Sequence, residues 1–156
     1  MTYEEWEQGV PAELAGDPLW RMEVYRWRLF AADIAWPDVT KLAADRRTVQ
    51  LSSQLVDAVG SIGANISEGY SRWSGRDQAR FYEYALGSAR ESRTWDFDAR
   101  HVLGSKVAAH RMQLLTKIIK HLLKAIPAQR GFKLHEDPLP YADDLLSPSA
   151  QVPMPE

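Results

Sequence analysis

The residue types that most often perform chemistry are spaced too far apart in this chain to form a known catalytic or metal-binding motif. Histidines occur at His101, His110, His121 and His135, and no two lie three or four positions apart. The H-E-x-x-H pattern of zinc proteases and the Glu-x-x-His pattern of di-iron bundles are both missing. The chain has no cysteine, which excludes disulfides, thiolate metal sites and cysteine nucleophiles. We therefore predict no catalytic residue, no metal and no cofactor.

Two glycine–serine segments are equally weak as catalytic motifs. The run from Gly69 to Trp73 lacks the second glycine of a nucleophile elbow. The run from Gly60 to Gly63 is too short for a phosphate loop, and no Lys-Ser or Lys-Thr pair follows it. We predict that the protein is not an enzyme, and the sequence identifies no small-molecule substrate.

A polar stripe accompanies an apolar one in the second predicted helix. Its members, spaced four, three and four positions apart, are Ser61, Asn65, Glu68 and Arg72. This spacing places them along one side of a helix. If they face solvent, they form an ordinary solvated surface. If they are buried between helices or subunits, they form a structural hydrogen-bond network or a binding site. A buried Glu68 would need a cationic partner, because an unpaired buried charge is costly.

Basic residues gather at two places in the second half of the chain. The candidate nucleic-acid-binding residues are Arg72, Trp73, Arg76, Arg80, Lys106, Lys117, Lys120 and Lys124. The simpler interpretation is that they solubilise the outer surface of a helical protein. The alternative is phosphate contact, with Trp73 as a platform on which a base stacks. RNA or single-stranded DNA is therefore a candidate partner.

Charge divides the chain into three parts. Residues 1–17 contain five acidic and no basic residues, and so do the proline-rich residues 134–156. The middle, residues 18–133, carries all 19 Lys and Arg residues against 11 acidic ones. We predict two flexible acidic tails around one folded domain, with residues 134–156 extended or disordered. The tails either solubilise the protein or lie on the basic middle part.

Apolar periodicity predicts four helices in the middle part. Asp17-Pro18 is a typical helix start, and the first helix kinks or ends at Pro37, after which a short helix continues to Ala44. The second carries an apolar face at Leu51, Leu55, Ala58, Ile62 and Ile66, with Gly60 and Gly63 as points of close helix approach.

The third predicted helix spans residues 75–103, with Ser74 as its cap and Gly104 after its end. Its apolar stripe consists of Phe81, Tyr84, Ala85, Ser88, Trp95 and Val102. The fourth begins at Ser105, packs through Ala108, Met112, Leu115, Ile118 or Ile119, Leu122 and Ile126, and stops at Pro127. Long helices joined by short turns predict an all-α, antiparallel up-down-up-down four-helix bundle.

The first predicted helix carries many aromatic residues. Their apolar surface is larger than a single bundle core can cover. Trp27 and Phe30 lie off its main apolar stripe, and Trp20 stands near its start. We predict a subunit interface at Trp20, Trp27 and Phe30, and core filling is the competing explanation.

Two runs in the middle of the chain carry a family resemblance. They are Ser61-Ile62-Gly63-Ala64-Asn65-Ile66-Ser67-Glu68-Gly69-Tyr70-Ser71-Arg72 and Ala85-Leu86-Gly87-Ser88-Ala89-Arg90-Glu91. Shorter matches are Met22-Glu23-Val24-Tyr25, Ser53-Gln54-Leu55 and Leu103-Gly104. Together they resemble the four-helix-bundle proteins encoded in intervening sequences of bacterial 23S rRNA genes, over roughly residues 20–125. Gly63 stands where the family usually has proline, Ser67 where it has alanine, and Arg93 where an acidic residue is common.

The resemblance implies a self-assembling bundle, commonly a homopentameric ring, with no established enzymatic activity. The accessory variability proteins of diversity-generating retroelements are similar, and they bind nucleic acid. We therefore predict an oligomeric interaction scaffold of unknown specific role, and as the alternative a nucleic-acid-binding accessory factor. The start of the chain lacks the apolar segment of a signal peptide, and no stretch is long enough to cross a bilayer. We accordingly expect a cytoplasmic protein without membrane partners.

Overall fold

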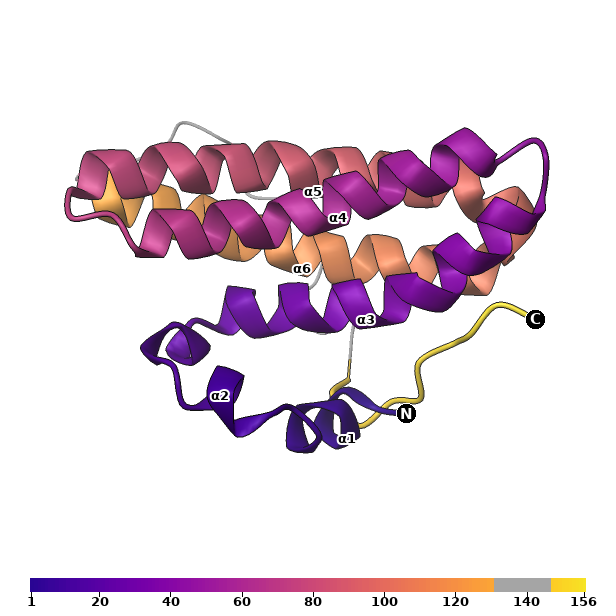
Figure 1. Ribbon diagram of the computed structural model, residues 1–156, viewed down its shortest axis with the longest axis horizontal. Helices are drawn as coiled ribbons and strands as arrows, with labels where there is room; N and C mark the ends of the chain where they lie inside the picture. Colours follow the sequence, from indigo (N-terminus) through magenta and orange to yellow (C-terminus); the bar gives the residue numbers. More distant parts are fainter. Residues whose placement is uncertain (131–146) are drawn as a thin grey trace.

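The structure, a computed structural model, describes residues 1–130 and 147–156, and every regular element in those residues is helical. The elements in chain order are α1 (Tyr3–Gln8), α2 (Ala12–Ala15), the 3-10 turn η1 (Pro18–Arg21), α3 (Glu23–Ala44), α4 (Val49–Tyr70), α5 (Gly75–Leu103) and α6 (Ser105–Arg130). The long helices α3 to α6 lie side by side, alternating in direction (Figure 1). The prediction of an all-α helical bundle is confirmed.

Local sequence signals set several of the helix ends. The side chain of Asp17 accepts a hydrogen bond from the Leu19 N–H at 2.7 Å, so it caps η1 and not a long helix. Ser74 accepts from the Asp77 N–H at 3.1 Å and starts α5 as predicted. Gly104 ends α5 with a φ of +89°, a backbone conformation that side chains disfavour.

Two prolines do not end the helices that contain them. Pro37 lies inside α3, which continues to Ala44 and changes direction in its second half (Figure 1). The prediction that Pro127 stops the last helix is wrong, because α6 continues to Arg130. A Cβ placed on Gly75 would lie 2.4 Å from the Gln129 carbonyl oxygen. The start of α5 therefore packs closely on the last turn of α6, which helps to hold that turn beyond the proline.

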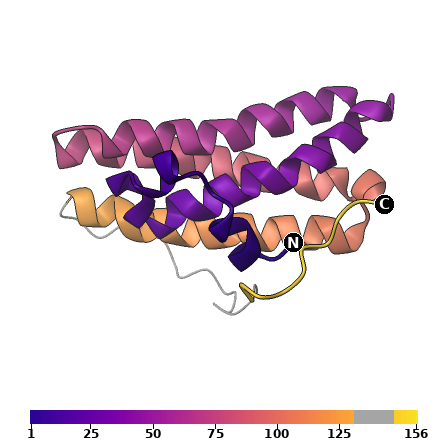
Figure 2. The same ribbon diagram turned by 60° about the horizontal axis from the view of Figure 1, so that its bottom comes forward.

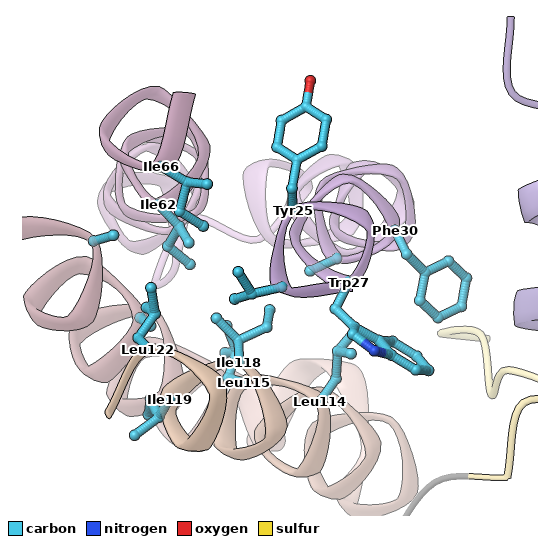
Figure 3. Close-up of a cluster of buried hydrophobic side chains, with 14 of the residues drawn as sticks. Tyr25, Trp27, Phe30, Ile62, Ile66, Leu114, Leu115, Ile118, Ile119 and Leu122 are labelled. Atoms are coloured by element: carbon cyan, nitrogen blue, oxygen red, sulfur yellow. The ribbon is translucent and has the colours of Figure 1, made fainter. Parts of the chain in front are cut away.

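The bundle core is built mainly from β-branched and leucine side chains. Ile62 and Ile66 of α4 point toward Ile118 and Leu122 of α6, and all four are fully buried (Figure 3). Ile34 of α3 completes this centre and is 1 % exposed. The predicted apolar face of α4 is confirmed apart from the half-buried Leu51, and that of α6 is confirmed apart from the half-buried Met112.

The predicted core face of α5 is confirmed at Ala85 and wrong at Tyr84, and its other members, Phe81, Ser88, Trp95 and Val102, are half-buried. Tyr84 is 53 % exposed, whereas the buried face consists of Ala79, Tyr82, Ala85, Leu86, Ala89, Ser92, Asp96, Ala99 and Leu103. Small side chains at most of these positions let α5 approach α4 and α6 closely. A search for large apolar residues therefore selects a neighbouring stripe, because the residues facing the core are mostly small or polar.

Glycine serves close approach at only one of the two predicted points in α4. A Cβ on Gly60 would meet nothing within 4 Å, so that prediction is wrong. A Cβ on Gly63 would lie 2.0 Å from the guanidinium carbon of Arg28, and it is this side chain of α3 that crosses the glycine. Burial lowers the pKa of Arg28, whose Nε has no hydrogen-bond partner among the described residues.

The first 17 residues do not form the predicted flexible tail. They contain α1, whose Tyr3 and Trp6 side chains are each only 8 % exposed. Residues 147–156 form no helix, as predicted, but Val152 is buried and its N–H donates to the Met1 carbonyl at 3.1 Å. Both ends of the chain lie on the same side of the bundle (Figure 2). The rest of the predicted C-terminal tail, with His135, lies outside the described residues.

Candidate interaction surfaces

The polar stripe of α4 is a surface feature and not a buried network. Glu68 and Arg72 form an ion pair with each other, and their side chains are about half exposed. Asn65 Nδ2 donates to the Ser61 carbonyl within the same helix at 2.8 Å. The Arg72 guanidinium lies 4.6 Å from the ring centre of Phe81. The two charged residues of the stripe therefore pair with each other. Glu68 has a cationic partner, although it lies at the surface and not in the interior.

The turn between α4 and α5 presents the first group of predicted nucleic-acid-binding residues together. Arg72, Arg76 and Arg80 are exposed, and the Trp73 side chain is fully exposed. Arg80 also pairs with Asp77 at 3.5 Å and lies near the Phe81 ring. An uncovered indole between arginines is the arrangement on which a nucleic-acid base can stack.

The four lysines of α6 do not join this group as one surface. Lys106 lies at the start of α6, beside the turn between α5 and α6, whereas the exposed Lys124 lies toward the other end of α6, whose last turn packs on Gly75. The Lys117 Nζ lies 3.5 Å from the ring centre of Trp27, and burial lowers the pKa of this lysine. Lys120 is half-buried. Lys117 is therefore part of an internal cation–π contact and not a free phosphate ligand.

The predicted subunit interface on α3 is covered within the chain. Trp27 is 3 % and Phe30 2 % exposed, and both point to the side of α3 away from Ile62 and Ile66 (Figure 3). Tyr3 of α1 stacks on Trp27 with ring centres 4.0 Å apart, and Trp6 lies 5.3 Å from Phe30. The interface prediction is thus wrong for Trp27 and Phe30, because the first helix of the same chain buries them.

Trp20, the third predicted interface residue, is half-buried and lies 6.4 Å from Trp6, ring centre to ring centre. Polar contacts fix α1 in this position. Trp6 Nε1 donates to Asp33 at 2.5 Å, and Glu7 accepts from the Tyr3 hydroxyl at 2.9 Å and pairs with Arg26 at 3.2 Å. Burial and the Glu7 carboxylate raise the pKa of Tyr3.

The role of Tyr3 and Trp6 was missed in the sequence, although two signals mark it. Thr2 and Glu5 form a reciprocal capping box, in which the Glu5 N–H donates to Thr2 at 3.1 Å and the Thr2 N–H to Glu5 at 2.8 Å. Tyr3 and Trp6 are three positions apart and so share one helix face. The high acidic content of the segment obscured both signals.

A second missed feature is a buried ionic cluster where α3, α5 and α6 meet. Arg111 of α6 forms two hydrogen bonds with Asp38 of α3, at 2.7 and 3.1 Å, and both residues are almost fully buried. Asp96 of α5 faces this pair. Burial raises the pKa of Asp96 to about 8, and the charge of Asp38 adds to the rise while Arg111 opposes it. Arg111 therefore forms hydrogen bonds with Asp38 and also interacts with Asp96 through its charge. With a pKa of about 8, the Asp96 carboxyl group is largely protonated at neutral pH.

The neighbouring His110 is half-buried, and its Nδ1 lies 2.9 Å from Arg111 Nη1. Burial, together with the charge of Arg111, lowers the pKa of His110 to about 4. The imidazole is therefore neutral near pH 7. It accepts the arginine N–H, and its proton is carried on the other ring nitrogen.

A groove on the outside of the bundle runs between α5 and α6. Its lining residues are Arg93, Thr94, Phe97, Ala109, Met112, Gln113 and Thr116. Phe97 is 48 % exposed, and Met112 is half-buried beside it. Arg93 donates to the Thr116 hydroxyl at 3.1 Å, and the Arg100 guanidinium lies 3.8 Å from the Phe97 ring centre. The groove thus combines an apolar floor with one lining arginine, Arg93, and Arg100 lies beside it against the Phe97 ring.

A protein-family model matches the part of the chain that forms the four long helices. The sequence model of the 23S rRNA-intervening sequence protein family matches residues 25–124, which lie in α3 to α6. The chain belongs to this family. The match leaves out α1, α2, η1 and residues 147–156, so the cover on Trp27 and Phe30 comes from outside the matched region. No curated protein and no solved structure matches the chain.

Two kinds of feature, a membrane-spanning helix and a metal-binding cluster, are absent from the described residues. None of the helices in residues 1–130 and 147–156 is long and apolar enough to cross a membrane. The same part of the chain contains no group of three or more His, Asp or Glu side chains arranged to hold a metal ion.

Proposed function

We propose that the protein is a self-assembling, non-enzymatic helical-bundle scaffold of the rRNA intervening-sequence type. The observation that carries this proposal is apolar surface left over after the core is complete. Trp36 is 72 %, Tyr84 53 % and Phe97 48 % exposed, although the bundle interior is already filled by other residues. Large exposed apolar side chains of this kind are typical of interaction surfaces.

The non-enzymatic part of the proposal rests on how the titratable groups are used. Asp96 and His110, whose pKa values are shifted to about 8 and about 4, each interact with Arg111. Catalytic groups with shifted pKa values normally face a cleft that a substrate can enter. The groove between α5 and α6 is lined by Arg93 and by neutral side chains, which suits binding better than proton transfer.

Light scattering coupled to size-exclusion chromatography, over a wide range of protein concentration, tests the scaffold. We expect a discrete oligomer, and the family resemblance favours five subunits. A particle with the mass of one chain at every concentration would refute self-assembly.

A nucleic-acid-binding accessory role is the second candidate, and one observation favours it. Trp73 is fully exposed between the exposed Arg72 and Arg76, at the end of the bundle that also carries Lys124. Arginines can contact phosphates while the indole stacks on a base. This role is compatible with a scaffold, because a ring of subunits would repeat the basic end several times.

A mobility-shift assay with RNA and single-stranded DNA across a salt series tests the second role. Trp73→Ala and Arg76→Glu should each weaken binding, and Arg76→Glu should lower the salt dependence by about one unit of slope. Lys106→Glu, at the opposite end, is the matched control and should change little. Equal binding by all three variants would contradict the role assigned to this end.

A further inference from the structure

Every residue of the short helix α2 is exposed in the part of the chain that the structure describes. None of its residues is buried, and Leu14 is 38 % exposed. Its turn is closed by its own backbone, with the N–H groups of Leu14 and Ala15 both donating to the Pro11 carbonyl at 3.0 Å. An isolated helical turn is marginal in water, so an exposed leucine on such a turn suggests a surface that covers it elsewhere.

The surroundings of Leu14 are acidic. Glu13 precedes it in α2, Asp17 follows, and residues 1–17 contain no Lys or Arg. The exposed part of α2 and its flanks is thus a leucine side chain between carboxylates. It would fit a shallow apolar groove with basic walls.

The groove between α5 and α6 has that complementary character. Phe97 and Met112 provide the apolar floor, and the lining includes Arg93 but no acidic residue. The helix α6, which forms one wall, contains no Asp or Glu along its whole length. Charge and apolar character therefore match between α2 and this groove.

The two surfaces also lie on different sides of the molecule. Residues 1–17 lie on the side of α3 (Figure 2), whereas the groove lies between α5 and α6. A contact between α2 of one copy and the groove of the next uses different surfaces on the two partners. Contacts of this type generate rings when the rotation closes.

We propose that α2 of one copy docks in the α5–α6 groove of a second copy, with Leu14 against Phe97 and Met112. This inference rests on the proposed self-assembly and names the surfaces that mediate it. Glu13 and Asp17 then lie near Arg93 of the groove and Arg100 beside it, so assembly is stronger at low salt.

The absence of native cysteine makes a direct test possible. A Leu14→Cys chain is mixed with a Phe97→Cys chain that carries a tag of different size, under mild oxidation. A disulfide joining the two chains is expected on a non-reducing gel. A Val56→Cys chain replaces Phe97→Cys as the control, since Val56 of α4 is similarly exposed, at 45 %, and lies outside the groove.

A second measurement uses the strength of assembly. Leu14→Ala should weaken self-association about tenfold, as expected for losing one buried leucine side chain at a contact. Its circular dichroism should match the parent, because Leu14 belongs to neither hydrophobic core cluster of the described residues.

The outcomes separate this inference from the proposed function. Cross-linking to Phe97→Cys well above that to Val56→Cys, together with the weaker Leu14→Ala assembly, supports the docking. Equal cross-linking to both, in a protein that light scattering shows to be oligomeric, overturns the docking and leaves the scaffold intact. A monomeric parent protein overturns both.

Discussion

The buried carboxyl group of Asp96 has a measurable consequence for stability. Asp96 is 4 % exposed and faces Asp38, whose charge is already matched by two hydrogen bonds from Arg111. The folded protein therefore keeps Asp96 protonated up to a pKa of about 8, whereas the unfolded chain ionises it near the ordinary aspartate pKa of 3.8. We predict that Asp96→Asn, which keeps the size and removes the titration, stabilises the fold at neutral pH.

The sign and size follow from linkage. The folded-state pKa is raised, so the contribution of a neutral Asp96 is complete below about pH 4 and is lost as the pH rises toward about 8. One pKa unit corresponds to about 1.4 kcal/mol. At pH 7 the penalty in the native protein is therefore on the order of 4 kcal/mol, and the advantage of Asp96→Asn approaches zero near pH 4.

Urea unfolding, followed by tryptophan fluorescence, measures the difference in the free energy of unfolding between the parent and Asp96→Asn. The measurement is made at fixed protein concentration and at several pH values across this range. The control is Asp98→Asn, because Asp98 is an exposed carboxylate on the same helix. It should leave the pH profile unchanged. If the curves of the parent and Asp96→Asn run parallel from acid to neutral pH, the reasoning about the buried cluster is refuted.

Four further substitutions follow from packing, each measured by the free energy of unfolding. Arg111→Met strips the buried Asp38 of its cation and should cost about 3 kcal/mol. Trp6→Ala removes the side chain that covers Phe30 and should cost about 3 kcal/mol, with a rise in tryptophan exposure to quenchers. Gly87→Ala meets nothing within 4 Å and should stabilise α5 by about 1 kcal/mol. Gly69→Ala places a Cβ 2.8 Å from the Tyr82 ring and should destabilise by about 1–3 kcal/mol, so equal effects of the two glycine changes would contradict these contacts.

The helical architecture could be predicted because its signals are local. The caps at Asp17 and Ser74 and the turn at Gly104 depend on neighbours within a few residues. The apolar face of α4 repeats with helical spacing and is buried in the structure. The family resemblance rested on runs within α4 and α5, which lie in the region that the family model matches.

The core face of α5 and the ionic cluster could not be predicted in the same way. Alanines and Asp96 carry little apolar signal, so their burial depends on how closely α4 and α6 approach. Arg111 and Asp38 lie 73 positions apart in the chain, and neither forms a motif with its sequence neighbours. Their pairing exists only because α3 and α6 meet at that level of the bundle.

The amino-acid sequence by itself determined that the segments of α3 to α6 are helical, that α5 spans Gly75–Leu103 and α6 begins at Ser105, and that α3 carries more aromatic surface than one core requires. Only the tertiary structure decided what covers that surface. Tyr3 and Trp6 lie in a six-residue helix, which is too short to be stable alone, so its order depends on Trp27 and Phe30 and on the backbone of residues 147–156. The spacing of residues within each segment does not show which distant segment it packs against.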